Sequence, residues 1–347
     1  MVAINNAMAV VNTQATQRTL SSIVMESEGN ALIVKAFGGY SSSKTSVPAE
    51  GELPIVAIDG PTLKSMFSPL SGEKIKLDVD NDSLLATCGR TKLEVPIYGE
   101  TPVIPENTEP ELFVVSNAVV GRIAHALGFV RPAIKAMADL VAMTGFMLHC
   151  EDGVLDVVGA SYRIVGYERI LCDPQAVQDI DAILPLDSLK ILSMVNTARA
   201  SIAITESSII IKEPGVEFRL QRLEGQPVNY TPYLLDDGIG IIKVSSKAII
   251  ESLASISSVA KMSQTVNIAT GADFVEISSS SQGSKAMAEA TVEVENFESI
   301  SVPYTPLYEF VSKMSGETLT ILITANRRAI KVIDGYKACV LFAKIGE

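Results

Sequence analysis

The sequence repeats one construction three times, from Val56, from Ala182 and from Ile300. Each segment has a short apolar strand, a turn with Pro, Gly or Asp, an amphipathic helix of about three turns, and a strand in which apolar and polar residues alternate. When one leucine of each helix is aligned, the spacing to the next strand agrees to within one residue. The aligned pairs are Leu63 and Ile75, Leu189 and Ile202, and Leu307 and Leu319. Self-similarity over so long a period indicates tandem copies of one folded unit.

A second element of the same kind precedes each of these segments. Its strand reads ALIVKA around Leu32, GVLDVV around Leu155 and ADFVEIS around Val275. Its helix is clearest in NAVVGRIAHAL and KAIIESLASIS, and it is weaker in INNAMAVVN. Each copy therefore consists of two similar halves, and each half has one helix and several antiparallel strands.

These copies predict an α+β fold of three tandem domains, each with two helices packed on antiparallel sheets. We expect the domains to span residues 1–107, 108–236 and 237–347, because the segments PENTEPE and LLDDGIG interrupt the periodicity near these boundaries. A chain of 347 residues is long enough for several domains that each bury a core.

No apolar run in the sequence approaches the roughly 20 residues that cross a bilayer, and the N-terminus lacks the pattern of a secretory signal. We therefore expect a cytoplasmic protein with no membrane partner. The four cysteines are widely spaced and form no CxxC pair, so we expect buried thiols. Because the chain has only two histidines, we expect no metal site, and no sequence motif indicates a cofactor.

Charge is distributed unevenly along the repeats. The formal net charge of -12 argues against nucleic-acid binding in general, because Lys and Arg are the residues that neutralise phosphates. The acids gather in strands and turns, however, and the helices carry few of them. We expect a positive helical surface that contacts DNA phosphates weakly and without sequence readout. Its candidate residues are Lys64, Arg122, Arg131, Lys190, Arg199, Lys247, Lys261 and Lys313.

The tandem copies, the segment RLQRLEGQPVNYTPYL from Arg219 and a strand that ends in SYRI resemble the bacterial-type DNA polymerase sliding clamp, the beta subunit of DNA polymerase III. The resemblance covers nearly the whole chain. It implies a homodimer in which two subunits join head to tail as a closed six-domain ring, with the helices lining the hole. Such a ring encircles double-stranded DNA and tethers the polymerase, so the resemblance implies a processivity factor and no catalysis.

The resemblance also implies a hydrophobic pocket between the second and third domains, which takes short linear peptides from the polymerase and the clamp loader. Its positions lie around GASYRI, in LEGQPVNYTPY, just before TGFML and in the C-terminal strand. The residues implied are Met143, Gly159, Ser161, Tyr162, Arg163, Ile164, Pro227, Tyr233, Val340, Phe342, Ala343 and Lys344. We expect Gly159 and Ser161 to leave room for a side chain of the partner.

Two departures from the family pattern have consequences. Where family members have a Gly-His pair and C-terminal methionines, this chain has Ser161-Tyr162 and VLFAKIGE, so we expect it to prefer different peptides. The family also opens with a strand, whereas this chain begins almost at its first helix, which would leave a sheet edge uncovered at the subunit interface. A divergent or virus-encoded clamp fits both departures.

Two other classes of protein compete with this interpretation. An enzyme would need a nucleophile beside a base, but the neighbours His149 and Cys150 point to opposite faces of a strand, and Glu151-Asp152-Gly153 is typical of a hairpin turn. A ring-forming viral structural protein remains the alternative, since repeated β-rich domains suit it equally well. Acid-poor helices in every copy favour the clamp.

Overall fold

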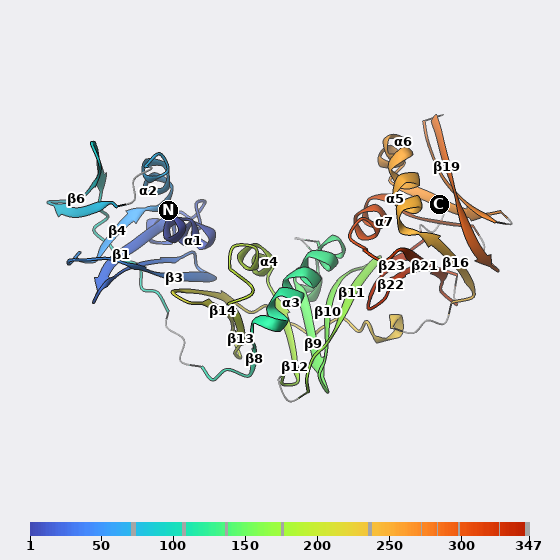
Figure 1. The fold of residues 1–347 in the computed structure, drawn as a ribbon, viewed down its shortest axis with the longest axis horizontal. Coiled ribbons are helices and arrows are strands. Elements are labelled where there is room, and N and C mark those ends of the chain that lie inside the picture. Colours follow the sequence, from blue (N-terminus) through green and yellow to red (C-terminus); the bar gives the residue numbers. More distant parts are fainter. Residues whose placement is uncertain are drawn as a thin grey trace. The chain divides into compact units, whose positions relative to one another are not determined.

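The computed structural model describes residues 1–70, 74–105, 109–135, 138–174, 177–234, 238–271, 273–282, 284–297, 299–325 and 327–343 (Figure 1). These residues form strand-rich α+β architecture in which every described strand pairing is antiparallel, as predicted. The chain divides into two compact units, Met1–Gly121 with Asp187–Arg222, and Arg122–Leu186 with Leu223–Glu347.

The first unit is built on an eight-stranded sheet and a three-stranded sheet. The larger sheet has the order β4 (Val56–Asp59), β1 (Ser22–Glu28), β2 (Ala31–Phe37), β3 (Ser41–Pro48), β15 (Val216–Gln221), β14 (Ser208–Glu213), β13 (Ser201–Ile204), β8 (Phe113–Val115). The smaller one has the order β5 (Lys76–Asp80), β6 (Ser83–Cys88), β7 (Thr91–Pro96). Its helices are α1 (Val2–Val10), α2 (Gly60–Phe67) and α4 (Asp187–Leu192), and α1 packs on β1, β2 and β3.

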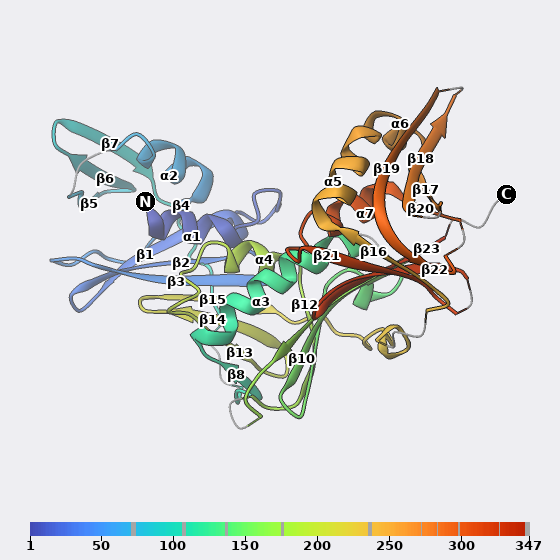
Figure 2. The same ribbon diagram turned by 45° about the vertical axis from the view of Figure 1, so that its right-hand side comes forward.

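The second unit is built on one twelve-stranded sheet. Its order is β12 (Ile180–Leu184), β9 (Phe146–Glu151), β10 (Val154–Ser161), β11 (Ile164–Leu171), β23 (Lys337–Phe342), β22 (Ala329–Asp334), β21 (Thr318–Ile323), β16 (Gly240–Ser245), β19 (Ser284–Glu295), β18 (Phe274–Ser281), β17 (Thr265–Thr270), β20 (Ile300–Pro303). Helices α5 (Ser246–Ser255), α6 (Ser257–Ser263) and α7 (Tyr304–Val311) pack on this sheet (Figure 2). Helix α3 (Asn117–Val130) begins in the first unit and ends in the second.

The predicted repeat is confirmed in the elements of its second halves and corrected in the length of their helices. In the third copy, the single helix expected in the first half is instead two helices, α5 and α6. The strands after the three aligned helices are β5, β13 and β21, each within one residue of its predicted start. Helices α2, α4 and α7 have 8, 6 and 8 residues, which is about two turns rather than three. Each helix is followed by a serine whose hydroxyl donates to a backbone carbonyl of the last turn. The last carbonyls of a helix have no donor within the helix, and the serine supplies one. These bonds join Ser68 to Lys64 at 2.7 Å, Ser193 to Lys190 at 2.6 Å and Ser312 to Tyr308 at 2.6 Å.

Strand pairing joins successive copies into continuous sheets. Strand β3 pairs with β15 in the first unit, and β11 pairs with β23 in the second. The backbone N–H of Gln221 donates to the Tyr40 carbonyl at 2.8 Å, and that of Phe342 donates to the Arg163 carbonyl at 3.0 Å, so the two junctions share one register. The predicted boundaries at residues 107 and 236 lie outside the described residues, and the division into three domains stays a prediction.

The second-unit sheet has a helix face and an outer face. A Cβ added to Gly159 would lie 2.6 Å from the Val130 carbonyl oxygen at the end of α3, and one added to Gly166 would lie 2.6 Å from the Phe310 ring of α7. Phe129 and Phe310 meet edge to face with ring centroids 5.2 Å apart, so α3 and α7 share this face. Alternation along β10 therefore directs Gly159 toward the helices and its neighbours toward the opposite face.

Substituting Gly159→Ala tests this close approach. We expect a loss of about 1–3 kcal/mol in the free energy of unfolding, because the backbone of α3 would have to move away from β10. The control is Gly128→Ala, which adds a methyl to α3 where a Cβ meets nothing within 4 Å; this change should be neutral or stabilise the protein by up to about 1 kcal/mol. Urea denaturation followed by circular dichroism measures both, and equal stabilities would contradict the packing role of Gly159.

Candidate functional site

The SYRI segment is a β-hairpin at the junction of β11 and β23. Ser161 and Ile164 form the last pair of the hairpin, and Tyr162 and Arg163 are its two exposed turn residues. The Tyr162 hydroxyl donates to Asp139 Oδ2 at 3.0 Å, and this hydrogen bond is the main reason that the pKa of Tyr162 is raised. Strand β10 (Val154–Ser161) thus ends at a turn that presents an aromatic ring and a guanidinium to solvent.

The end of β23 lies beside this turn. Val340 is opposite Val165, and the backbone of Phe342 donates to the Arg163 carbonyl at 3.0 Å. The ring of Phe342 packs edge to face against Tyr233, with centroids 5.7 Å apart. The structure therefore brings together the turn, the C-terminal strand and the LEGQPVNYTPY segment.

Behind these residues lies an apolar cluster on the outer face of the sheet, which we call the outer cluster. Its buried members are Ala142, Met147, Val158, Ala160, Val165, Tyr167, Ile183, Tyr230, Ala329, Ala338 and Val340, and Leu223, Val228, Tyr233, Leu234, Ile333 and Phe342 pack against them. The segment from 223 to 234 thus lies over the sheet, and Val228 donates its backbone N–H to Met147 Sδ at 3.2 Å.

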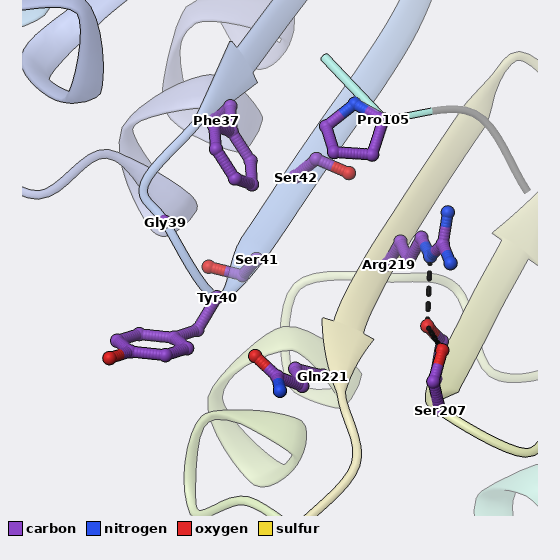
Figure 3. A pocket seen from close by; sticks show the side chains of 10 residues that line it. Phe37, Gly39, Tyr40, Ser41, Ser42, Pro105, Ser207, Arg219 and Gln221 are labelled. Atoms are coloured by element: carbon purple, nitrogen blue, oxygen red, sulfur yellow. Dashed lines mark hydrogen bonds between the residues drawn. The ribbon is translucent and has the colours of Figure 1, made fainter. Parts of the chain in front are cut away.

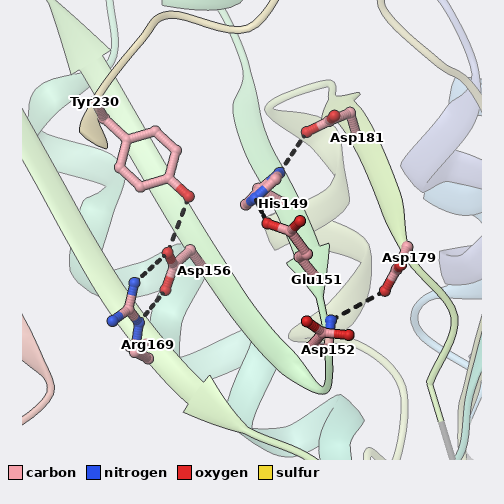
Figure 4. A network of polar contacts seen from close by, with 8 residues as sticks. All are labelled: His149, Glu151, Asp152, Asp156, Arg169, Asp179, Asp181 and Tyr230. Atoms are coloured by element: carbon pink, nitrogen blue, oxygen red, sulfur yellow. Dashed lines mark hydrogen bonds and ion pairs between the residues drawn. The ribbon is translucent and has the colours of Figure 1, made fainter. Parts of the chain in front are cut away.

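A buried polar network holds this covering segment in place (Figure 4). Arg169 donates through Nε and Nη2 to both carboxylate oxygens of Asp156, each at 2.8 Å, and the Tyr230 hydroxyl donates to Asp156 Oδ2 at 2.9 Å. Desolvation, followed by the charge of Asp156, raises the pKa of Tyr230 far above its usual range, so the hydroxyl keeps its proton. Sequence reasoning missed this network, although Asp156 interrupts the apolar residues at the start of β10.

A second buried cation holds the end of the same segment. Lys331 is 3% exposed, and its ammonium donates to the Leu234 carbonyl at 3.2 Å. The ammonium also lies 5.5 Å from the centroid of the Tyr167 ring, within reach of a cation–π interaction. Buried charges must be paired or hydrogen-bonded, so Lys331 ties the covering segment to β22.

The remaining predicted pocket residues fall in several places. Gly159, Ser161 and Ile164 face the helices, because Ile164 pairs with Ser161 and alternation puts Ser161 on the side of Gly159. The expectation that Gly159 leaves room for a partner is wrong, because Val130 and Ile134 occupy that space. Met143 is buried in the short helix η3 (Val141–Met143), Pro227 is exposed, and the Ala343 backbone N–H donates to the Arg328 carbonyl at 2.7 Å. Lys344 lies outside the described residues.

The eight candidate DNA-facing residues are all exposed on helices or just beyond them. Several donate to backbone carbonyls nearby: Arg122 to Leu171 at 2.8 Å, Arg131 to Ile134 at 3.1 Å, Lys190 to Ala9 at 2.9 Å and Lys313 to Gly128 at 2.7 Å. Desolvation lowers the pKa of Lys313; Glu309 opposes this shift and Arg131 adds to it. Lys313 therefore reaches the last turn of α3, and Arg131 follows directly after that helix.

The enzyme interpretation receives no support from His149 and Cys150. His149 Nδ1 lies 2.7 Å from Asp181 Oδ1, whereas Cys150 is buried with its pKa raised to about 11, mainly by desolvation. Asp152 and Gly153 form the predicted hairpin turn with positive φ values of 50° and 78°. Among the described residues, no group of three or more His, Cys, Asp or Glu side chains could hold a metal ion. No helix in the described ranges is long and apolar enough to cross a membrane.

The architecture defines a class: the chain has the fold of a DNA polymerase sliding clamp over nearly its whole length. Among solved structures, it is similar to the DNA polymerase III beta subunit of Pseudomonas aeruginosa, with a TM-score of 0.88 at 14% identity over 99% of this chain and 96% of that chain. It is equally similar to the Thermotoga maritima beta subunit, with a TM-score of 0.88 at 15% identity over 100% and 97%. The Helicobacter pylori beta clamp bound to a DNA ligase peptide gives a TM-score of 0.86 at 16% identity over 99% and 97%. No protein-family model and no curated protein sequence matches the chain.

Substituting Tyr230→Phe tests the polar network. We expect a loss of about 1–3 kcal/mol in the free energy of unfolding, because buried Asp156 would lose a donor without gaining water. Tyr162→Phe is the matched control, since it also removes a hydroxyl bonded to an aspartate, but at an exposed turn; it should change stability by less than about 0.5 kcal/mol. Equal losses in urea denaturation would show that the buried network does not stabilise the covering segment.

Proposed function

We propose that this protein is a DNA sliding clamp, a non-catalytic processivity factor that encircles double-stranded DNA and tethers a DNA polymerase. The main support is the similarity to DNA polymerase III beta subunits over 99% of the chain, which includes the repeated helices and the strand pairing between copies. A viral structural ring would not need acid-poor helices in every copy. Of the seven α-helices in the described ranges, only α4, α5 and α7 contain an acid.

Sequence-independent DNA contact follows from where the positive charge lies. Lys and Arg on the helices can neutralise phosphates, while the acids on strands and turns account for the net charge of -12. Arg131 and Lys313, at the end of α3, are two of the side chains that would donate to DNA phosphates. Single Lys and Arg side chains that contact the phosphates of the DNA backbone give weak, salt-dependent binding, and such binding lets a ring slide along the DNA.

Partner recognition, in this proposal, occurs at the end of the β10–β11 hairpin. Tyr162, Arg163, Tyr233 and Phe342 form a surface with aromatic rings and one exposed guanidinium, a composition typical of binding hot spots. Short linear peptides of a polymerase and a clamp loader are the proposed ligands. The aromatic Tyr162 and Phe342 set this surface apart from the family pattern, and they are the residues that would set peptide preference.

Ring closure by a homodimer follows from the strand edges. Strands β7, β15 and β23 each end a three-stranded meander through a two-residue turn, with the last pairs Cys88–Thr91, Glu213–Val216 and Asp334–Lys337. Within the chain β15 pairs with β3 and β23 pairs with β11, but β7 stands at a sheet edge. The first half of each copy also ends in a third strand, namely β3, β11 and β19. Strand β19 pairs with β16 only through Val292–Glu295, so the start of β19 offers an edge to a second copy.

The shared register predicts which residues meet across that edge. Because Ile164 at the start of β11 lies opposite Leu341 of β23, Ser284 at the start of β19 would lie opposite Val95 of β7 in the partner. The next pair would be Lys285 and Glu94, both exposed in the single chain. Opposite charges directly across antiparallel strands stabilise the pairing.

Retention on circular DNA tests encirclement. Subunits are diluted to separate dimers and then concentrated in the presence of nicked circular DNA, so that rings close around it. We expect the protein to stay with the circle during gel filtration in high salt, because a topological link does not depend on phosphate contacts, and to leave when a restriction enzyme linearises the circle. Equal retention on linear DNA with free ends would contradict encirclement.

Charge exchange tests the predicted edge pairing. Glu94→Lys and Lys285→Glu each place like charges opposite one another at both interfaces of a dimer, and each should raise the dimer dissociation constant about 5- to 30-fold, for about 1–2 kcal/mol in total. The double variant restores opposite charges and should recover most of the affinity. Sedimentation velocity measures all three, and a double variant weaker than both single variants would refute this register.

A further inference from the structure

A cavity of about 180 Å³ lies in the first unit where β3 meets β15 (Figure 3). Its walls include Phe37 and Tyr40 near the β2–β3 turn, Ser42 of β3, Arg219 of β15 and Pro105. Tyr40 is 79% exposed. The proposed DNA and peptide surfaces use none of these residues, so the cavity needs an explanation of its own.

The cavity lies at the junction of β3 and β15 in the position that the outer cluster has at the junction of β11 and β23. Arg219 pairs with Ser42 where Val340 pairs with Val165, and Ser42 pairs with Phe37 where Val165 pairs with Ala160. Cross-strand partners share a face, so the Arg219 face corresponds to the outer face of the second unit. The matching hydrogen bonds from Gln221 to Tyr40 and from Phe342 to Arg163 fix the same register at both junctions.

The two sites differ in how their cation is satisfied, and Arg219 is only partly buried, whereas Lys331 is buried. In the second unit, Lys331 donates to the Leu234 carbonyl of the covering segment. In the first, Arg219 Nε donates to Ser208 Oγ at 2.9 Å, but Nη1 is buried and has no hydrogen-bond partner among the described residues. Figure 3 shows the guanidinium between the strand of Ser42 and the segment of Ser207. A buried guanidinium nitrogen without an acceptor is costly, so this site favours an added acceptor.

The nearest acid does not fill that role. Glu109 accepts from the backbone and hydroxyl of Ser207 at 3.1 and 2.7 Å. Hydrogen bonds from Thr205 and Ser207 are the main reason that its pKa is lowered, and the charge of Arg219 contributes least. The Glu109 carboxylate is thus held by hydrogen bonds from the loop before β14.

We propose that the β3–β15 cavity is a second peptide-binding site, which takes an acidic side chain of a linear segment from a partner protein. The carboxylate would accept from the Arg219 guanidinium, whose planar donors suit a carboxylate. An apolar or aromatic neighbour of that acid would lie against Tyr40 and Pro105. This inference rests on the cavity and on the register of the junction, and it does not require the chain to encircle DNA.

Fluorescence anisotropy with two peptide panels tests the site. Each fluorescein-labelled pentapeptide has a central Glu flanked on both sides by Leu, Phe or Tyr, and the matched panel has Gln in place of Glu. We expect at least one Glu peptide to bind at least tenfold more tightly than its Gln partner. Arg219→Met should weaken that peptide at least tenfold, and Arg219→Lys should restore part of the loss, because a lysine keeps the charge but not the planar donors.

Two further variants separate the outcomes. Tyr40→Ala changes an exposed side chain, so the fold should persist while the Glu peptide binds more weakly. Phe342→Ala alters the hairpin surface of the second unit and should leave this affinity unchanged. Loss of binding in Phe342→Ala but not in Tyr40→Ala, equal binding of Glu and Gln peptides, or no binding of any Glu peptide would overturn the proposal. Retention on circular DNA should be normal in Arg219→Met and Tyr40→Ala, so failure of the clamp function would be seen separately.

Discussion

Backbone pairing between successive copies is the constraint on which the rest of this structure depends. Strand β3 completes its hydrogen bonds with β15, and β11 completes its own with β23, so neither copy satisfies its strand edges alone. Buried or extended backbone groups must find partners. Applied twice within the chain, this requirement leaves β7 and the start of β19 at the ends of the series, which is why we propose a second copy of the chain as the partner.

The pairing also separates the two faces on which we propose that binding occurs. On one face the small residues Gly159 and Gly166 let α3 and α7 approach the sheet, and these helices carry cations with few acids. On the other face a covering segment is held by Asp156 and Lys331. In the proposed function, contact with a polyanion and contact with peptides use opposite sides of one sheet, and neither needs to disturb the other.

The junction of β3 and β15 has the same strand register as the junction of β11 and β23, but different side chains on its outer face. Its outer face has Arg219 and Ser42 where the second junction has Val340 and Val165. The polar replacement leaves a cavity and an unsatisfied guanidinium nitrogen in place of a closed apolar cluster. Copies of one fold can therefore offer sites of unlike chemistry, because the register is kept while the side chains change.

Local patterns predicted much of this protein. Periodicity located the helices and most strands, and Asp152-Gly153 was recognised as a turn, because helices, strands and hairpins depend on residues close in sequence. The uneven placement of acids could also be read directly from the order of residues. Helix length was overestimated, since serines such as Ser193 end helices through hydrogen bonds that periodicity does not register.

The faces and partners of those elements depended on residues far apart in the chain. Gly159 was expected to open a pocket, but Val130 fills the space beside it. The bond from Tyr230 to Asp156 and the approach of Arg219 to the β2–β3 turn link residues that no local pattern connects. Sequence order determines which helices and hairpins form, because their hydrogen bonds join residues close in the chain. The tertiary structure decides which surfaces are buried and which stay accessible, because the side chains that cover a surface come from distant segments.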